Sequence, residues 1–266
     1  MVANQAKDVP ANDLKIFVVT HKKFWMPEDS VYIPLHAGRA GKHDLGFLGD
    51  NTGDNISDKN AHFCELTAQY WAWKNVNCQF IGFCHYRRYF GHTSFYLPIS
   101  KRKDKIYSKS DYEELLQNCD IIVPQYRNYF IETVRSHFDH AHNAHDMNEV
   151  ESIINEMFPD YKEAFYKVMN GTKVHLYNMY VMRKEIFDKY CLWLFTILFK
   201  VEEKINISKY NTYQSRVFGF ISERLLDVWI VKNNLLFREV PVVSLVPTFW
   251  PPKIFRFLWR KFFGHS

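Results

Sequence analysis

The sequence predicts an α/β fold in which helices flank a central, mainly parallel β-sheet. Two observations support this prediction. Short apolar runs rich in β-branched and aromatic residues alternate with longer segments of helical periodicity, and the alternation continues from about residue 14 to about residue 246. Strands separated by helices in this way usually pair in parallel, so their carboxyl ends share one edge of the sheet.

Five apolar runs are the predicted strands. The first, Leu14–Thr20, reads LKIFVVT and has the residue types of a buried strand. The others cover residues 80–84, 119–123, 174–182 and 235–246. Residues 22–52 contain several glycines and prolines and show little periodicity, so we expect a loop there.

Six segments are predicted helices. Ser57 or Asp58 is a good N-cap for a helix that runs to about Asn75. The remaining helices are expected at about residues 111–117, 145–157, 159–169, 184–204 and 213–232.

Length and composition indicate one domain with a sizeable core. The chain has 266 residues, of which 47% are apolar and 24% charged, which excludes a disordered protein. No apolar run reaches the roughly 18 to 20 residues of a membrane-spanning helix, and the polar start lacks a signal peptide's apolar stretch. Five cysteines without paired spacing favour a reducing cytosol. We therefore expect a polar lead at 1–13, one domain at 14–246 and a tail at 247–266.

The positive charge is concentrated in two places. Lysine and arginine total 34 against 29 acidic residues, a net charge of +5. Residues 85–105 carry six of the basic residues and one acid, and residues 251–266 carry four basic residues and no acid. The rest of the chain is therefore slightly acidic. Because the chain also lacks a nucleic-acid-binding motif, we expect no nucleic acid partner.

The tail has the pattern of a basic amphipathic helix. One side carries an apolar stripe at helical spacing, formed by Phe255, Leu258, Trp259 and Phe262. Another side carries Lys253, Arg256 and Arg260. This combination is typical of a helix that lies in a membrane interface. The alternatives are a helix that docks on its own domain or at a dimer interface.

The segment from His85 to Phe90, HYRRYF, directly follows a predicted central strand. Ligands of such sheets bind beyond the carboxyl ends of the strands, where His85, Arg87 and Arg88 would lie. An arginine side chain presents a planar fork of donors that suits phosphate oxygens. The segment is therefore either a diphosphate clamp or a structural pair of arginines bonded to acids and carbonyls.

Three further groups of polar residues could carry chemistry. Residues 54–60 contain Asp54, Asn55 and Asn60, which either cap a helix or hold a ribose or sugar ring. Four histidines stand close together with two acids: His137, His140, His142, His145, Asp139 and Asp146. Their spacing does not define a metal site, and one of them acting as a proton donor or base is favoured. Glu223 could be a general base, or it could pair with its neighbours on a solvated helix face.

Several enzyme signatures are missing from the sequence. It has no GxGxxG motif opening a helix, no P-loop, no HExxH and no GxSxG elbow. The dehydrogenase, P-loop and hydrolase interpretations therefore lose their main support. Also missing is the Asp-x-Asp that many nucleotide-sugar enzymes use to hold a divalent metal, so Mn²⁺ or Mg²⁺ is possible but has no motif here.

Several blocks of the sequence match a known family. They are 53–57 with Asn60, 65–67, 70–75, 81–82, HYRRYF at 85–90, 178–182, 191–195 and RVFGFISERL at 216–225. Together they cover the chain from about residue 14 to residue 246. The sequence resembles the bacterial capsular-polysaccharide, exopolysaccharide and O-antigen glycosyltransferases, a family formerly catalogued as a domain of unknown function that includes galactofuranosyltransferases.

The resemblance implies a GT-A-like single domain that transfers galactofuranose or another hexose from a UDP-sugar to a lipid-linked oligosaccharide, with inversion. The enzyme would work in the cytoplasm, at the inner face of the cell membrane. HYRRYF would occupy the place of the Asp-x-Asp motif, so protein cations would replace the metal. Glu223 would be the catalytic base, with Asp146 in reserve. The alternative is a non-catalytic carbohydrate-binding or scaffold protein of the same machinery.

The resemblance also implies which residues bind the sugar donor and which bind the acceptor. The donor would bind near Thr20, His21, Asp54, Asn55, Asn60, His85, Arg87 and Arg88. The acceptor would bind near Tyr86, Asn178 and Arg216.

Overall fold

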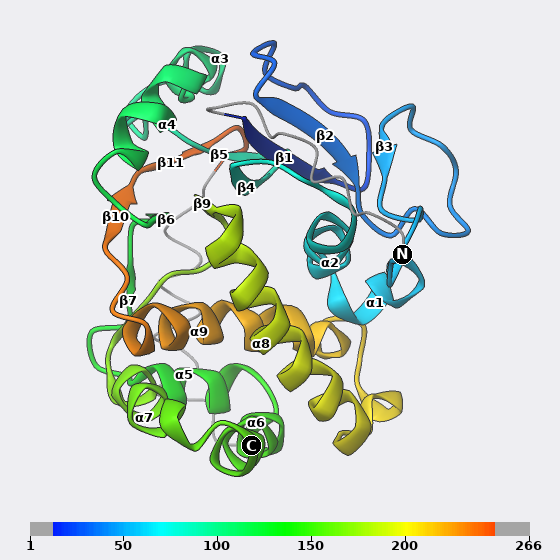
Figure 1. The fold of residues 1–266 in the computed structure, drawn as a ribbon, viewed down its shortest axis with the longest axis vertical. Coiled ribbons are helices and arrows are strands. Elements are labelled where there is room, and N and C mark those ends of the chain that lie inside the picture. The colour runs from blue at the N-terminus through cyan, green and yellow to red at the C-terminus, as the bar shows by residue number, and fades with distance from the viewer. Residues whose placement is uncertain (1–12, 248–266) are drawn as a thin grey trace, which may run out of the picture.

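The computed structural model describes residues 13–247, which form a central sheet with helices on both faces (Figure 1). Seven strands follow one another across the sheet in the order β10-β6-β9-β4-β1-β2-β3. Their bounds are Phe237–Val240, Ile121–Pro124, Tyr180–Arg183, Phe80–His85, Leu14–Thr20, Tyr32–His36 and Leu48–Gly49. Along this path only β9 runs antiparallel to its neighbours. The predicted α/β class and the mixed, mostly parallel sheet are therefore confirmed.

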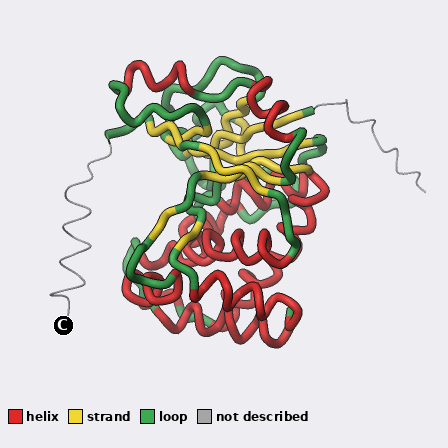
Figure 2. Tube along the Cα trace, turned by 90° about the vertical axis from the view of Figure 1, so that its left-hand side faces the viewer, coloured by secondary structure: helices red, strands yellow, loops and turns green. Residues whose placement is uncertain are grey.

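The reversed strand β9 has a direct effect on the site. Because β9 is antiparallel to β4, its amino end lies at the same edge as the carboxyl end of β4, and Tyr180 pairs with Phe83. The residues just before β9 consequently meet the residues just after β1, β2 and β4. Figure 2 shows the strands as one layer above most of the helices.

Two short strands extend the sheet beside β4. β5 (Arg88–Phe90) folds back on β4 through a turn at Tyr86 and Arg87, and His85 pairs with Arg88. β11 (Val242–Ser244) then pairs antiparallel with β5. A separate two-stranded sheet joins β7 (Arg127–Asn128) to β8 (Lys173–Val174).

The helices form two groups. One face of the sheet is covered by α2, α8 and α9, beyond which α5, α6 and α7 pack (Figure 1). Helices α3 and α4 lie at the opposite face with β5 and β11. The bounds of α1 to α9 are Asn60–Phe63, Leu66–Asn75, Ile99–Arg102, Lys109–Leu116, Val134–Ala141, Ala144–Met157, Lys162–Asn170, Lys184–Lys204 and Val217–Lys232. Short 3₁₀ turns cover 57–59, 103–105, 159–161, 207–209 and 214–216.

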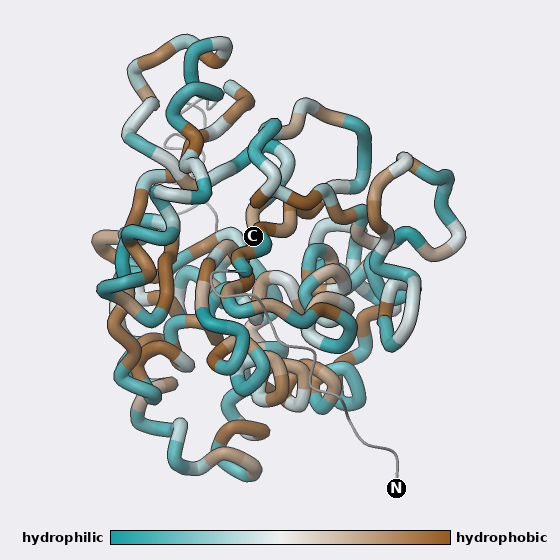
Figure 3. The backbone as a smooth tube through the Cα atoms, turned by 45° about the horizontal axis from the view of Figure 1, so that its top comes forward, coloured by the Kyte–Doolittle hydropathy of each residue, from teal (hydrophilic) through white to brown (hydrophobic). Residues whose placement is uncertain are grey.

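The core has two parts because side chains of a strand alternate between the two faces of the sheet. Phe17, Ile81 and Tyr180 point into the larger apolar cluster with α2, α8 and α9. Ile16 and Val181 point into the smaller cluster on the other face. Hydrophobic stretches accordingly run through the centre of the molecule, and hydrophilic ones gather on the outlying loops (Figure 3).

Most predicted elements are present, and four differ. The strand expected at 235–246 forms two strands, β10 and β11, which are separated at Pro241 and pair with β6 and β5, respectively. The expected loop at 22–52 contains β2 and β3, so that prediction was wrong. The helix expected from Ser57 to Asn75 is broken at Cys64, whose φ of 51° and ψ of −127° are not helical. The strand expected at 174–182 is split into β8 and β9 by a turn at Tyr177 and Asn178, which both have positive φ. The break and the turn both belong to the candidate site.

Two terminal predictions lie outside the described residues. The tail from 248 onward, with its basic and apolar stripes, is one, and the polar lead up to residue 12 is the other. Within residues 13–247, no helix is long and apolar enough to cross a bilayer.

Gly82, in the middle of β4, offers a test of the sheet packing. A Cβ at this position would lie 2.6 Å from Ile16 Cδ1 and 2.7 Å from Val181 Cγ2. We expect Gly82→Ala to lower the free energy of unfolding by about 1–3 kcal/mol, measured by urea denaturation. Gly219→Ala is the matched control, because a Cβ there meets nothing closer than 3.7 Å. Equal stability of the two variants would contradict this packing.

Candidate active site

The candidate site lies at one edge of the sheet, where four strand ends meet. Thr20 ends β1, His36 ends β2 and His85 ends β4, and Thr20 is paired with His36 in the sheet. Asn178 lies just before β9 and reaches the same edge because that strand is reversed. Five of the predicted site residues are therefore neighbours: Thr20, His21, His85, Arg87 and Asn178.

Arg87 and Arg88 have no acidic partner within 4.0 Å in the described part of the chain. The Arg87 guanidinium instead lies 4.8 Å from the centre of the Tyr86 ring. The Arg88 guanidinium lies 4.7 Å from the centre of the Tyr177 ring. Both arginines are half-buried, and each guanidinium lies against an aromatic ring and not against an acid of the described residues.

Other cations surround these arginines. The pKa of His21 is lowered from its ordinary value by partial burial and then by the charges of Lys22 and Arg87. Lys42 and His36 act in the same direction. A histidine that loses its proton more easily because of its neighbours reports a positive local potential, which favours an anionic ligand.

We call the group of Arg87, Arg88, His21, Lys22, Lys42 and His36 the cationic edge. Two buried residues, Thr20 and Tyr86, contact members of this group. Thr20 is 1% exposed, and its hydroxyl donates to the carbonyl of Lys22 at 2.6 Å. Tyr86 is 4% exposed and meets the ring of His21 edge-on at 5.3 Å. The exposed His21 is therefore held by Tyr86 on one side. The acceptor-binding role expected for Tyr86 stays a prediction.

His85 connects the segment of residues 85–90 to the turn before β9. Its Nε2 donates to the carbonyl of Tyr177 at 2.6 Å. Burial lowers the pKa of His85, and the charges of Arg88 and Arg87 also lower it, although Glu65 acts in the opposite direction. The neutral imidazole consequently serves as a hydrogen-bond donor that orients the turn.

Two carboxylates lie on the other side of this turn. Glu223 Oε1 accepts the backbone N–H of Tyr177 at 2.8 Å, and its Oε2 pairs with Arg224 Nη1 at 2.9 Å. Glu65 Oε1 accepts from Asn178 Nδ2 at 2.7 Å. Burial raises the pKa of Glu223, and the charge of Glu65 raises it further, while Arg224 opposes this. A carboxylate with a raised pKa holds a proton more readily, as a general base requires.

Asn178 is a junction between helices. Its Nδ2 donates to Glu65 and also to the carbonyl of Gly219 at 3.1 Å. Its Oδ1 accepts from Ser222 Oγ at 2.8 Å, and its backbone carbonyl accepts from Gln69 Nε2 at 3.0 Å. The amide of Asn178 is thus occupied by α2 and α9, and its predicted contact with an acceptor remains a prediction.

Three predicted donor-binding residues, Asp54, Asn55 and Asn60, lie in the loop before α1 and at the first residue of this helix. Asp54 Oδ1 accepts from the hydroxyl of Tyr70 at 3.1 Å, on α2. Asn55 closes a local turn by accepting from Ser57 N and donating to Gly53 O. Asn60 Oδ1 accepts from Lys42 Nζ at 3.0 Å, and this lysine belongs to the cationic edge. Of these three residues, Asn60 is therefore the one that contacts a lysine near His21.

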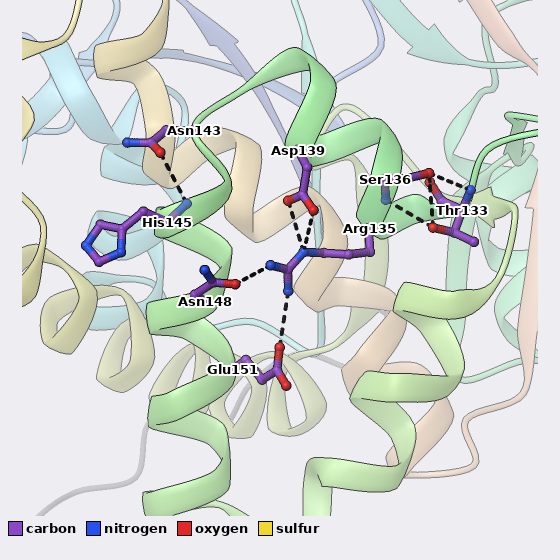
Figure 4. A network of polar contacts seen from close by, with 8 residues as sticks. All are labelled: Thr133, Arg135, Ser136, Asp139, Asn143, His145, Asn148 and Glu151. Carbon is purple, nitrogen blue, oxygen red and sulfur yellow. Dashed lines mark hydrogen bonds and ion pairs between the residues drawn. The ribbon is translucent and has the colours of Figure 1, made fainter.

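The histidine-rich segment has a structural network of its own (Figure 4). Arg135 on α5 binds both oxygens of Asp139 at 2.9 and 3.0 Å and reaches Glu151 and Asn148 on α6. A hollow of about 630 Å³ beside this network is lined by Asn148, Glu151, Ser152, Asn155 and Glu156. Neither the network nor the hollow involves the strand ends.

Asp146, the reserve base, anchors a loop. It is 1% exposed, burial raises its pKa, and its Oδ1 accepts from the hydroxyl of Tyr210 at 2.5 Å. No group of three or more His, Cys, Asp or Glu side chains in the described range could hold a metal ion.

Three residues of the site were not predicted from the sequence. They are Glu65, Tyr177 and His36, whose Nδ1 is buried without a hydrogen-bond partner. Glu65 stands in a block that resembles the family, which was the available signal. Nothing in the local sequence indicates that Tyr177 would adopt a φ of 80°.

A solved structure resembles this fold closely. The apo structure of the WbbM bifunctional glycosyltransferase superimposes with a TM-score of 0.82 at 30% sequence identity. The match covers 89% of this chain and 46% of that one, so the chain spans less than half the length of that protein. The fold is that of a GT-A-like glycosyltransferase domain, as expected, and the match supports a transferase.

The chain belongs to the family described as Domain of unknown function (DUF4422), whose sequence model matches residues 15–234. With the structural match, this confirms the polysaccharide-glycosyltransferase family that the sequence blocks resemble. No curated protein matches the chain.

The unpaired arginines can be tested by binding of UDP in isothermal titration calorimetry. We expect Arg87→Ala and Arg88→Ala each to weaken UDP binding about tenfold or more, because each removes a charge-assisted contact to phosphate. Arg238→Ala, at an exposed position on β10, is the control and should bind UDP like the wild type. Unchanged affinity in both site variants would contradict an anion site here.

Proposed function

We propose that this domain transfers a hexose, such as galactofuranose, from a UDP-sugar to a lipid-linked oligosaccharide in the synthesis of a bacterial surface polysaccharide. The observation that carries the proposal is the pair of unneutralised arginines, Arg87 and Arg88, facing an edge with further positive charge. A nucleoside diphosphate is the leaving group that such an edge would stabilise.

In this proposal the donor lies along the cationic edge. The nucleoside binds near Thr20, His21 and Asn60, with Asp54 and Asn55 shaping the loop. The diphosphate meets Arg87 and Arg88, and His85 holds the turn that carries the stacked ring of Tyr177. Since the guanidinium stays protonated at any physiological pH, the leaving group is stabilised by permanent charges.

The acceptor hydroxyl attacks the anomeric carbon in one displacement. Its oxygen forms the new bond to carbon while the bond between that carbon and the phosphate oxygen breaks. Glu223 takes the hydroxyl proton, the electron pair of the broken bond leaves with UDP, and the configuration inverts. The raised pKa of Glu223 supports this role, and its hydrogen bond from Tyr177 N orients the carboxylate. Arg216, directly before the same helix, would face the acceptor.

We also propose that the domain works in the cytoplasm, at the inner face of the cell membrane. The basic amphipathic pattern of residues 251–266 supports this. A second support is the segment that bears Phe95 and Tyr96, which are 81% and 66% exposed. Within the same segment Lys101 is exposed and has no acidic partner within 4.0 Å among the described residues. Apolar rings beside a free cation suit an anionic lipid surface.

Glu223→Gln tests the catalytic base. We expect kcat/KM for transfer from UDP-galactofuranose to a lipid-linked acceptor to fall by about 10²–10⁴, because the amide cannot take the proton. UDP affinity should stay unchanged, and Glu163→Gln, at an exposed position on α7, should behave like the wild type. In the wild type the rate should rise with pH through a pKa above the ordinary value of about 4.3 for Glu. Full activity of Glu223→Gln would overturn Glu223 as the base, whereas absence of transfer by the wild type would leave the non-catalytic interpretation.

Deletion of residues 251–266 tests the membrane contact. In a flotation assay with vesicles that contain phosphatidylglycerol, we expect the full chain to float and the shortened chain to stay largely at the bottom. The loss follows from removing four basic side chains, each contributing about 1 kcal/mol near an anionic surface. Vesicles of phosphatidylcholine alone are the control. Equal flotation of both proteins would contradict the tail as the anchor.

A further inference from the structure

The structure points to a stacking platform for the sugar acceptor, formed by Tyr213, Phe220 and His142 beside the candidate base. This inference rests on the proposed function and deepens it, because it assigns a subsite and a ligand class. The ligand is a pyranose unit of the acceptor, bound through the apolar C–H face of its ring. None of the three residues belongs to the nucleotide edge described above.

The three rings form a continuous aromatic group. His142 is stacked on Phe220, with centres 4.1 Å apart and planes inclined by 23°. Tyr213 lies 5.1 Å from Phe220 and is nearly parallel to His142, with an interplanar angle of 20°. Tyr213 is 54% exposed, so a large part of this group faces the solvent. An apolar surface that is ordered and exposed is a common feature of ligand sites.

Helix α9 brings this platform next to the base. Phe220 and Glu223 are three residues apart on α9, so they lie on the same side of the helix, and Arg216 directly precedes its first residue. Phe220 is separated from Glu223 by about 4.5 Å of helix rise. Arg216 is near both features, since its guanidinium is 5.6 Å from the centre of the Phe220 ring and its charge lowers the pKa of Glu223.

The loop that carries Tyr213 is pinned on two sides. Towards α5 and α6, Gln214 Nε2 donates to Ala141 O at 2.9 Å, and Tyr210 binds Asp146. Towards α1, His62 Nδ1 lies 3.1 Å from Ser215 O. These contacts hold Tyr213 before any ligand arrives, which limits the entropy lost on binding. They also give Asp146 a positioning function at this subsite.

The chemistry of the platform matches a sugar ring better than another ligand. Aromatic faces accept the C–H face of a pyranose, and the exposed Arg216 can donate to its hydroxyl groups. A sugar stacked on Tyr213 and Phe220 would extend along α9 towards Glu223. The hydroxyl to be glycosylated would then lie at the carboxylate, opposite the donor held by Arg87 and Arg88.

The test combines binding and kinetics on the full chain. Octyl β-D-galactopyranoside, octyl β-D-glucopyranoside and octyl α-D-mannopyranoside are the probes, observed by saturation-transfer difference NMR. We expect saturation of the ring C–H protons of at least one probe in the wild type and its loss in Tyr213→Ala. In transfer assays Tyr213→Ala should raise the acceptor KM about tenfold and leave kcat and the donor KM within twofold.

Two further variants separate a local from a general effect. Tyr213→Phe keeps the ring and should bind like the wild type, and so should Tyr126→Ala, which removes an exposed tyrosine that has no part in the proposed function. The platform is overturned if no probe receives saturation from the wild type, or if Tyr213→Ala leaves the signals unchanged. Glycoside binding that depends on Tyr213 without any transfer would support the platform and overturn only the proposed reaction.

Discussion

The left-handed turn at Tyr177 and Asn178 is the constraint on which the rest of the site depends. Two consecutive residues other than glycine have positive φ, 80° and 50°, and each such residue costs about 1–3 kcal/mol. The turn is stabilised by hydrogen bonds to the strands and helices around it. Tyr177 donates to Glu223 and accepts from His85, while Asn178 is bonded to Glu65, Gly219, Ser222 and Gln69.

The same turn lies between the arginines proposed to bind the leaving group and the carboxylate proposed to act as the base. On its sheet side, His85 and the stacked Arg88 belong to the cationic edge. On its helix side, Glu223 accepts from the backbone N–H of Tyr177, and Glu65 accepts from the side-chain amide of Asn178. In the proposed reaction, the leaving group would gain negative charge beside Arg88, and the acceptor proton would be taken by Glu223 on the other side of the turn. Electrostatic preorganisation of this kind lowers the barrier because the dipoles and charges need not move during the reaction.

The elements that were predicted correctly are those that the local sequence determines. The elements that were missed depend on tertiary contacts. β1 and α8 were predicted with the bounds that the structure has, because burial and periodicity specify them locally. β2 was missed because YIPLH contains Pro34, a residue that argues against a strand, and because its outer neighbour β3 has only two residues.

The break at Cys64 could not be predicted for a different reason. It is stabilised by the side chain of Asn60, which donates to the Cys64 carbonyl at 2.7 Å, and by Glu65 turning towards Asn178. His85, Arg87, Arg88 and Glu223 were predicted as site residues, and the structure brings them to the two sides of one turn. Their assigned roles stay predictions, and Glu65 joins them only through long-range contacts.

The pairing of β11 with β5 has a mechanical consequence. Leu245 N donates to the carbonyl of Arg87 at 2.9 Å, and Arg102 Nη1 donates to Ser244 O at 3.0 Å. Only a few residues separate this junction from the basic tail in the sequence. If the tail binds a lipid surface as proposed, and if that binding alters the pairing of β11 with β5, it would also alter the arginine turn. By thermodynamic reciprocity, a nucleotide that stiffens this turn would then also change how firmly the enzyme holds the membrane.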